Sequence, residues 1–274
     1  GTGAIEYVQT WGVQGRSEVW VGEQSGKTQD RGEVVPATDC VVACASVAPK
    51  GNEKYVALTF DEGPSGATKQ ILQVLKEKGV TATFFLSGDA VEASPATAKA
   101  IVDAGCEIGS NSYSDDSLKG QDREAVREQI TKGTDAMKSA TGVKTMLLRA
   151  PYAAFDEQNW IDAMDLVSAV VSWNIDSGDW LLNGADEQVS TVLDSVTPGN
   201  IVLLTDRDEC AEQTFEALPQ IIDGLIADGY KIVTLSDLVK TDTSLSKKLT
   251  SLTKVTMPKD AVFPQLAEDD DTTE

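Results

Sequence analysis

The sequence predicts an α/β protein: a distorted barrel of the (β/α)7 type with a small β-rich N-terminal extension. Between residues 55 and 239, short apolar segments alternate with amphipathic segments of helical length. Strands that are apolar throughout belong to a parallel sheet buried on both faces, because the connecting helices cover it. Seven such strands fit a closed or nearly closed barrel better than an open sheet.

Each element is indicated by its own pattern. The first strand is YVALTF at residues 55–60, and the helix at 69–78 carries its apolar residues on one side. Gly79 ends that helix, as a left-handed C-cap does. The same reasoning predicts further strands at 81–86, 106–109, 145–148, 167–173, 200–204 and 231–234, and further helices at 95–104, 122–141, 157–165, 187–195 and 210–228.

The two ends of the chain differ from this pattern. Short β-like runs at residues 17–21 and 40–45 alternate with turns, so we expect a hairpin or two there. Residues 268–274 are acidic and polar and are expected to be disordered. The predicted division is an N-terminal extension, a barrel, and a C-terminal extension with an acidic tail, at 1–50, 51–245 and 246–274.

Composition excludes several classes of function. The net charge of -21 repels phosphate backbones, which argues against nucleic acid and anionic membranes as partners. No apolar stretch reaches the ~18 residues of a membrane span, and no signal peptide is visible. Four cysteines without a CxxC pair, in a chain without histidine, do not predict a Cys/His zinc site. Cys40 and Cys44 would lie ~13 Å apart on a straight strand, beyond disulfide reach.

Polar residues follow five of the predicted strands. In such barrels the functional loops lie at the C-terminal ends of the strands. Asp, Asn, Gly and Pro are ordinary turn formers there, but five such loops with an arginine and a tryptophan among them favour a site. The residues are Asp61 and Glu62; Asn111 and Asp115; Arg149, Pro151 and Tyr152; Asp176, Asp179 and Trp180; and Thr205 and Asp206.

Five segments in these loops resemble, in order, the motifs of the polysaccharide deacetylase (NodB-homology) family of metal-dependent carbohydrate esterases. TFDEGP at 59–64 resembles TFDDGP, and GCEIGSNSYSD at 105–115 resembles GHEIGNHTYSH. RAPY at 149–152 resembles RPPY, DSGDW at 176–180 resembles DxxDW, and LLT at 203–205 stands where the family has LxH. The resemblance covers roughly residues 55–239.

The resemblance implies a role for each matched position. The base would be Asp61 and the general acid would stand at Thr205, with Arg149 and Asp179 orienting them. A divalent metal such as zinc would be held at the positions of Glu62, Asn111 and Asp115. The substrate would contact Pro151, Tyr152, Trp180 and Leu203, with the tryptophan against the acetyl methyl group.

The chain departs from the family at the metal and acid positions. Glu62 replaces an aspartate, Asn111 and Asp115 replace two metal-binding histidines, and Thr205 replaces the histidine that acts as the general acid. A threonine hydroxyl does not donate a proton usefully near neutral pH. The remaining oxygen ligands suit calcium or manganese, if any cation. We expect instead no bound metal, with Arg149 forming an ion pair with Asp61, with Asp179 or with both.

Three functions are compatible with these residues. The first is a pseudoenzyme whose groove binds a glycan, such as an N-acetylated polysaccharide or peptidoglycan, or a protein. The second is an active hydrolase with an all-oxygen metal site, or with Asp61 and Asp115 acting as a carboxylate pair. The third is a structural role at the cell surface. The resemblance alone implies an extracytoplasmic or cell-surface location.

Overall fold

The strand β6 (Lys54–Asp61) is an inner strand of the main sheet of this computed structural model, which describes residues 3–249 and 261–262. The sheet order is β11-β12-β6-β7-β8-β9-β10-β1-β5, with β13 paired to the first half of β6. From β11 to β10 the pairs are parallel, as predicted. The remaining strands are β7 (Thr83–Leu86), β8 (Glu107–Ser110), β9 (Leu147–Leu148), β10 (Ala169–Val171), β11 (Ile175–Asp176), β12 (Ile201–Thr205) and β13 (Tyr230–Ile232).

All seven predicted barrel strands are present, but those predicted at 145–148 and 167–173 are shorter, at Leu147–Leu148 and Ala169–Val171. Two features of the sheet were not predicted. The two-residue strand β11 is too short to give a periodic pattern. At the other edge, β1 (Ile5–Thr10) pairs antiparallel with β10, where Ile5 lies opposite Val171. The path of the sheet has two ends, β11 and β5 (Val41–Ala45), so the barrel is curled but not closed by strand pairing.

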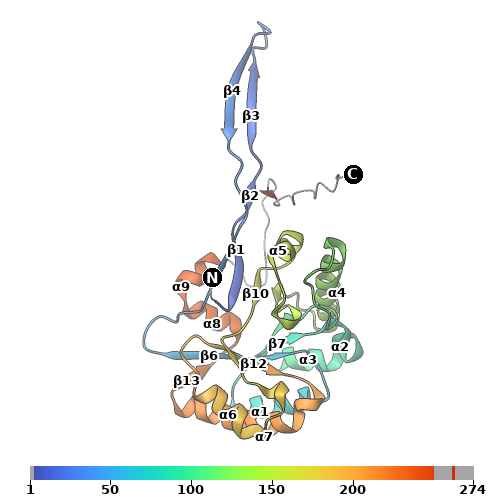
Figure 1. The fold of residues 1–274 in the computed structure, drawn as a ribbon, viewed down its shortest axis with the longest axis vertical. Coiled ribbons are helices and arrows are strands. Elements are labelled where there is room, and N and C mark those ends of the chain that lie inside the picture. Colours follow the sequence, from blue (N-terminus) through green and yellow to red (C-terminus); the bar gives the residue numbers. More distant parts are fainter. Residues whose placement is uncertain (1–2, 250–260, 263–274) are drawn as a thin grey trace, which may run out of the picture. The chain divides into compact units, whose positions relative to one another are not determined.

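Helices cover the sheet, and α1, α6 and α7 lie together on one side of β6 and β12 (Figure 1). All six predicted helices are present with small shifts at their ends. Three short helices, α2, α8 and α9, were not predicted, because about two turns are too few for a clear apolar period. The bounds are α1 (Thr68–Lys78), α2 (Gly88–Ala93), α3 (Pro95–Asp103), α4 (Arg123–Thr141), α5 (Glu157–Ala163), α6 (Ala185–Leu193), α7 (Ala211–Ala227), α8 (Leu235–Thr241) and α9 (Thr243–Lys248).

The last predicted strand is shorter than expected. Residues 231–234 were predicted as a strand, but β13 ends at Ile232. Thr234 is the N-cap of α8, and its side chain accepts a hydrogen bond from the backbone N–H of Asp237. A side chain that satisfies an otherwise unpaired N–H favours the start of a helix at this point.

The alternation of side chains along β6 separates core from site. Leu58 and Phe60 belong to the hydrophobic core formed with the helices, and the rings of Phe60 and Phe84 stack with centroids 5.0 Å apart. Successive residues of a strand point to opposite faces. Thr59 and Asp61 therefore point to the other face, and both are buried. The strand thus presents a hydroxyl and a carboxylate inside the barrel.

The structure consists of two compact units, of which the first contains residues 3–7 and 44–249 and the second 8–43 and 261–262. Residues 3–7 join the barrel because of the pairing of β1 with β10. The predicted division at residues 50 and 245 remains a prediction about domains, and the acidic tail at 268–274 lies outside the described residues.

The second unit contains a hairpin, as predicted. It pairs β3 (Arg16–Val21) antiparallel with β4 (Thr28–Val35), and β2 (Gly12–Val13) pairs with β14 (Ala261–Val262). None of the four cysteines forms a disulfide. Among the described helices, none combines the length and the apolar composition required to cross a membrane.

Candidate functional site

The loops after β6, β8, β9, β11 and β12 bring the predicted residues to one end of the barrel. Thr205 lies opposite Asp61 in the register of β12 and β6. The Asn111 side chain donates a hydrogen bond to the carbonyl of Arg149 at 2.8 Å. Asp179 accepts two hydrogen bonds from Thr205. The prediction that these five residues share one end of the sheet is confirmed.

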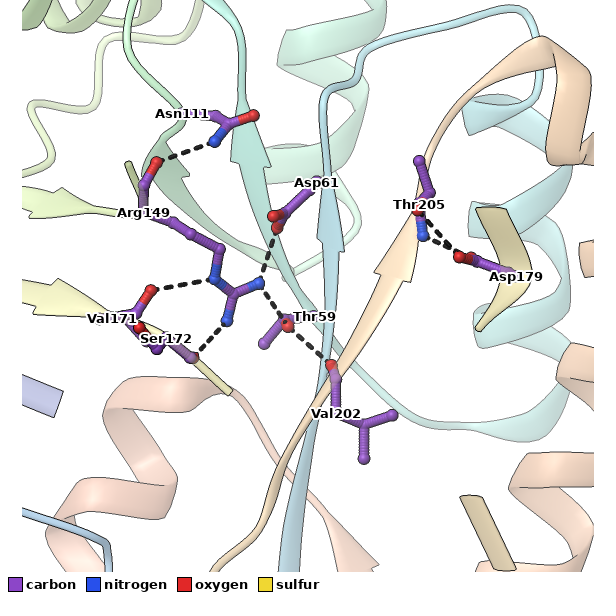
Figure 2. Close-up of polar contacts among 9 residues, drawn as sticks. All are labelled: Thr59, Asp61, Asn111, Arg149, Val171, Ser172, Asp179, Val202 and Thr205. Atoms are coloured by element: carbon purple, nitrogen blue, oxygen red, sulfur yellow. Dashed lines mark hydrogen bonds and ion pairs between the residues drawn. The ribbon is translucent and has the colours of Figure 1, made fainter. Parts of the chain in front are cut away.

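Arg149 is completely buried and is held by four acceptors (Figure 2). Its Nη1 donates to Asp61 Oδ1 at 2.6 Å and to Thr59 Oγ1 at 2.7 Å. Its Nε donates to the carbonyl of Val171 at 3.1 Å, and its Nη2 to that of Ser172 at 2.9 Å. The predicted ion pair of Arg149 with Asp61 is confirmed. A buried guanidinium with this many acceptors is fixed in position.

Burial and charge act on Asp61 in opposite directions. Removal from water raises the pKa of the Asp61 carboxyl group, and the charge and hydrogen bond of Arg149 lower it. Burial likewise lowers the pKa of Arg149, against the influence of Asp61. Each group thus offsets the cost of burying the other. One oxygen of the carboxylate expected to be the base is therefore engaged by Arg149.

Asp179 and Thr205 form a separate pair beside this network (Figure 2). Asp179 Oδ2 accepts from the backbone N–H of Thr205 at 2.6 Å, and Oδ1 accepts from its hydroxyl at 2.9 Å. Burial raises the pKa of Asp179 to about 6, and the two bonds from Thr205 oppose this shift. The Thr205 hydroxyl proton is directed to Asp179, in the position where the family resemblance places the general acid.

Arg207 joins two of the three positions where the resemblance places a metal. It follows β12, and its guanidinium forms ion pairs with Glu62 and with Asp115, the latter at 3.5 Å between Nη2 and Oδ2. The Tyr152 hydroxyl donates to the same Asp115 oxygen at 2.9 Å. Burial raises the pKa of Glu62 to about 7, against the influence of Arg207. Arg207 was not predicted as a site residue. The only feature of the sequence that could have indicated it is a basic residue directly after a predicted strand and its polar loop residues.

The residues at these positions do not fit a zinc ion. Zinc in proteins takes four ligands, mostly nitrogen and sulfur. Here Glu62 and Asp115 are paired with a guanidinium, and Asn111 directs its amide nitrogen at a carbonyl. Within residues 3–249 and 261–262, no three side chains among His, Cys, Asp and Glu are grouped to hold an ion.

Asp206 was noted in the sequence as a loop residue and has a positioning role in the structure. It is buried and accepts hydrogen bonds from Ser65 Oγ at 2.7 Å and Thr68 Oγ1 at 2.6 Å. Its backbone N–H donates to the carbonyl of Asp61 at 2.8 Å. A Cβ added at Gly63 would lie 2.2 Å from its carboxylate. Asp206 therefore fixes the loop that follows Asp61.

The residues expected to contact substrate differ in exposure. Tyr152 is 71% exposed and Trp180 55% exposed, with the indole N–H donating to Asp176 Oδ1 at 3.2 Å. Pro151 and Leu203 are buried. The two aromatic side chains are therefore accessible from solvent, whereas Pro151 and Leu203 are not, and the expected contact of all four with substrate remains a prediction.

Comparison with known proteins identifies the class that this fold and site define. Residues 48–167 match the family model for polysaccharide deacetylases. A peptidoglycan-N-acetylglucosamine deacetylase of Bacillus cereus is 32% identical over 217 residues, which are 78% of this chain and 79% of that protein. The chain belongs to the polysaccharide deacetylase family.

Other similar proteins include a much longer one and a pseudoenzyme. A bifunctional xylanase/deacetylase of Pseudobutyrivibrio xylanivorans is 37% identical over 68% of this chain, which spans only 31% of that protein. A CE4-family pseudoenzyme from Bacillus anthracis is 31% identical in its crystal structure, with a TM-score of 0.64 over 69% of this chain and 66% of that one. A mutant of that pseudoenzyme with restored enzymatic activity has 30% identity and a TM-score of 0.64.

Proposed function

We propose that this protein is a catalytically inactive polysaccharide deacetylase that binds a glycan at the mouth of its barrel. The mouth is the end of the barrel where Asp61, Asn111, Arg149, Asp179 and Thr205 lie. The observation that carries the proposal is the pairing of Glu62 and Asp115 with Arg207, where the family would hold its metal. Thr205 at the acid position is a second support. The similarity to a pseudoenzyme of the same family agrees with this reading.

The chemistry of the remaining residues is insufficient for deacetylation by the family's route. Asp61 keeps the position of the base, but no histidine exists to protonate a leaving amine. General acid–base catalysis is worth ~10²–10⁴-fold, and a hydroxyl does not supply the acid half near neutral pH. Arg149 and Arg207 cannot supply it either, since a guanidinium stays charged. An amine leaving group would therefore depart without a proton donor among these residues.

The exposed aromatic residues favour a glycan as the ligand. Tyr152 and Trp180 combine an apolar ring with a polar tip, which suits the alternating faces of a sugar. A net charge of -21 repels anionic polymers, whereas the N-acetylglucosamine units of chitin and of peptidoglycan are uncharged sugars. With such a ligand, the protein would act outside the cytoplasm, at the cell surface or cell wall.

Binding is tested by titration of the chain with chitin oligomers and peptidoglycan fragments. Trp180→Ala should weaken binding, whereas Trp20→Ala, which removes an equally exposed tryptophan of the hairpin, should not. The proposed site would be contradicted if both variants lost affinity equally, or if neither variant lost any. Absence of binding by the parent chain would favour the purely structural role instead.

Catalysis is tested by acetate release from the same substrates, with zinc, cobalt, manganese and calcium supplied in turn. We expect no release above background. The retained pair of Asp61 with Arg149 is the observation that favours the alternative, an active hydrolase with an all-oxygen metal site or with Asp61 and Asp115 as a carboxylate pair. Turnover on the order of 1 per second, abolished by Asp61→Asn, would establish that alternative.

The converse experiment restores the family residues. The fourfold variant Glu62→Asp, Asn111→His, Asp115→His and Thr205→His should bind zinc more tightly than the parent chain, because it regains nitrogen ligands. If the parent binds zinc as tightly, the substituted residues do not explain the difference from the family.

A further inference from the structure

The ion pairs of Arg207 connect loops that are distant in the sequence. Arg207 follows β12, whereas Glu62 follows β6 and Asp115 lies in the loop after β8. Tyr152, from the loop after β9, donates to the same carboxylate of Asp115. Four loops of the barrel mouth are thereby joined through one guanidinium and its two carboxylate partners.

Three of the acidic side chains at the mouth are paired with arginines. Asp61 is compensated by Arg149, and Glu62 and Asp115 are compensated by Arg207. A guanidinium has five N–H donors in a rigid plane and keeps its charge at all accessible pH values. One such group can bind two carboxylates at once, as a metal ion does.

We propose that Arg207 is the resident cation of the mouth and takes the place of the divalent metal. Glu62 and Asp115, two of the three positions where the resemblance puts metal ligands, are bound to Arg207. A divalent ion there would find both carboxylates already paired and would be repelled by the positive guanidinium. The Arg207 side chain is 42% exposed, so its guanidinium stands at the surface of the mouth. The inference deepens the proposed function, since a ligand would then bind without metal, but it does not require that the ligand is a glycan.

The test is the binding of Mn²⁺ and Zn²⁺ to the full chain by equilibrium dialysis. The parent should show no saturable site tighter than ~1 mM, the weak end of oxygen-ligand sites in proteins. Arg207→Gln frees Glu62 and Asp115 and should bind one Mn²⁺ about tenfold more tightly or better. Arg207→Lys keeps the charge and should resemble the parent.

The matched control is Arg127→Gln, which changes the net charge equally but removes an arginine paired with Asp165, outside the mouth. It should bind metal as the parent does. Equal Mn²⁺ affinity of the parent and Arg207→Gln would overturn the inference, as would an equal gain in the Arg127 variant. Acetate release by the parent would overturn the proposed function instead, so the two failures are distinguishable.

A second measurement remains decisive if Arg207→Gln does not fold. A ligand that binds only the folded state raises the melting temperature. The melting temperature of the parent should be the same in EDTA and in millimolar zinc, manganese or calcium. A rise with metal that Glu62→Gln abolishes would overturn the inference. In the fourfold histidine variant, adding Arg207→Gln should tighten zinc binding further.

Discussion

Replacing Asp179 by Asn should stabilise the barrel at neutral pH and leave its stability unchanged in acid. Asp179 is fully buried and accepts two hydrogen bonds from Thr205. Asparagine has the same shape: its oxygen can accept from the Thr205 N–H, and its amide can donate to the Thr205 hydroxyl. The substitution therefore mimics the protonated form of the aspartate without removing the pair.

The magnitude follows from the pKa of Asp179, which burial raises from 3.8 to about 6. A raised carboxyl pKa means that folding favours the protonated form, so this contribution to stability is complete below pH 3.8 and is lost as the pH rises through 6. A shift of about two units at ~1.4 kcal/mol per unit corresponds to about 3 kcal/mol. The variant should exceed the parent by up to that amount at pH 8.

The assay is urea unfolding of both proteins at pH values from 4 to 8. The variant's advantage should disappear toward pH 4 and reach its maximum above pH 7. Asp186→Asn, at an exposed position of α6, makes the same change in net charge and should show little pH-dependent difference. An advantage that does not depend on pH, or a loss of stability at pH 8, would refute the account of Asp179.

Three further substitutions test how the site is held, each measured by urea unfolding at pH 7. Arg149→Met should cost about 3–5 kcal/mol because it leaves Asp61 buried without its partner, and a cost below ~1 kcal/mol would contradict the buried pair. Thr68→Val removes one donor to the buried Asp206 and should cost about 1–3 kcal/mol, with no cost refuting that role. Gly63→Ala should cost about 1–3 kcal/mol through overlap with Asp206, and Asp206→Ser in the same chain should relieve part of it.

The elements that the sequence predicted well are those with strong local patterns. The strand at β6 and the helix at α1 were placed within a residue or two, because apolar periodicity and the left-handed Gly79 mark them directly. The loops after the strands were predicted to carry the site because functional loops of such barrels follow the C-terminal ends of the strands. The ion pair of Arg149 with Asp61 was predicted from the motifs. The two-residue strand β11 and the short helices α2 and α8 were missed, because none of them shows a clear apolar period of its own.

The sequence by itself determined the family, the order of strands and helices, the loops that carry the candidate site, and the absence of histidine from it. The tertiary structure alone decided the partners of Arg207 and Asp206. Arg207 and Asp115 are 92 positions apart, and their pairing depends on how the loops after β12 and β8 fold over the barrel. Local sequence patterns specify where strands and helices end. Which long side chains then meet depends on how far apart the loops lie, and only the packing of the whole barrel sets that distance.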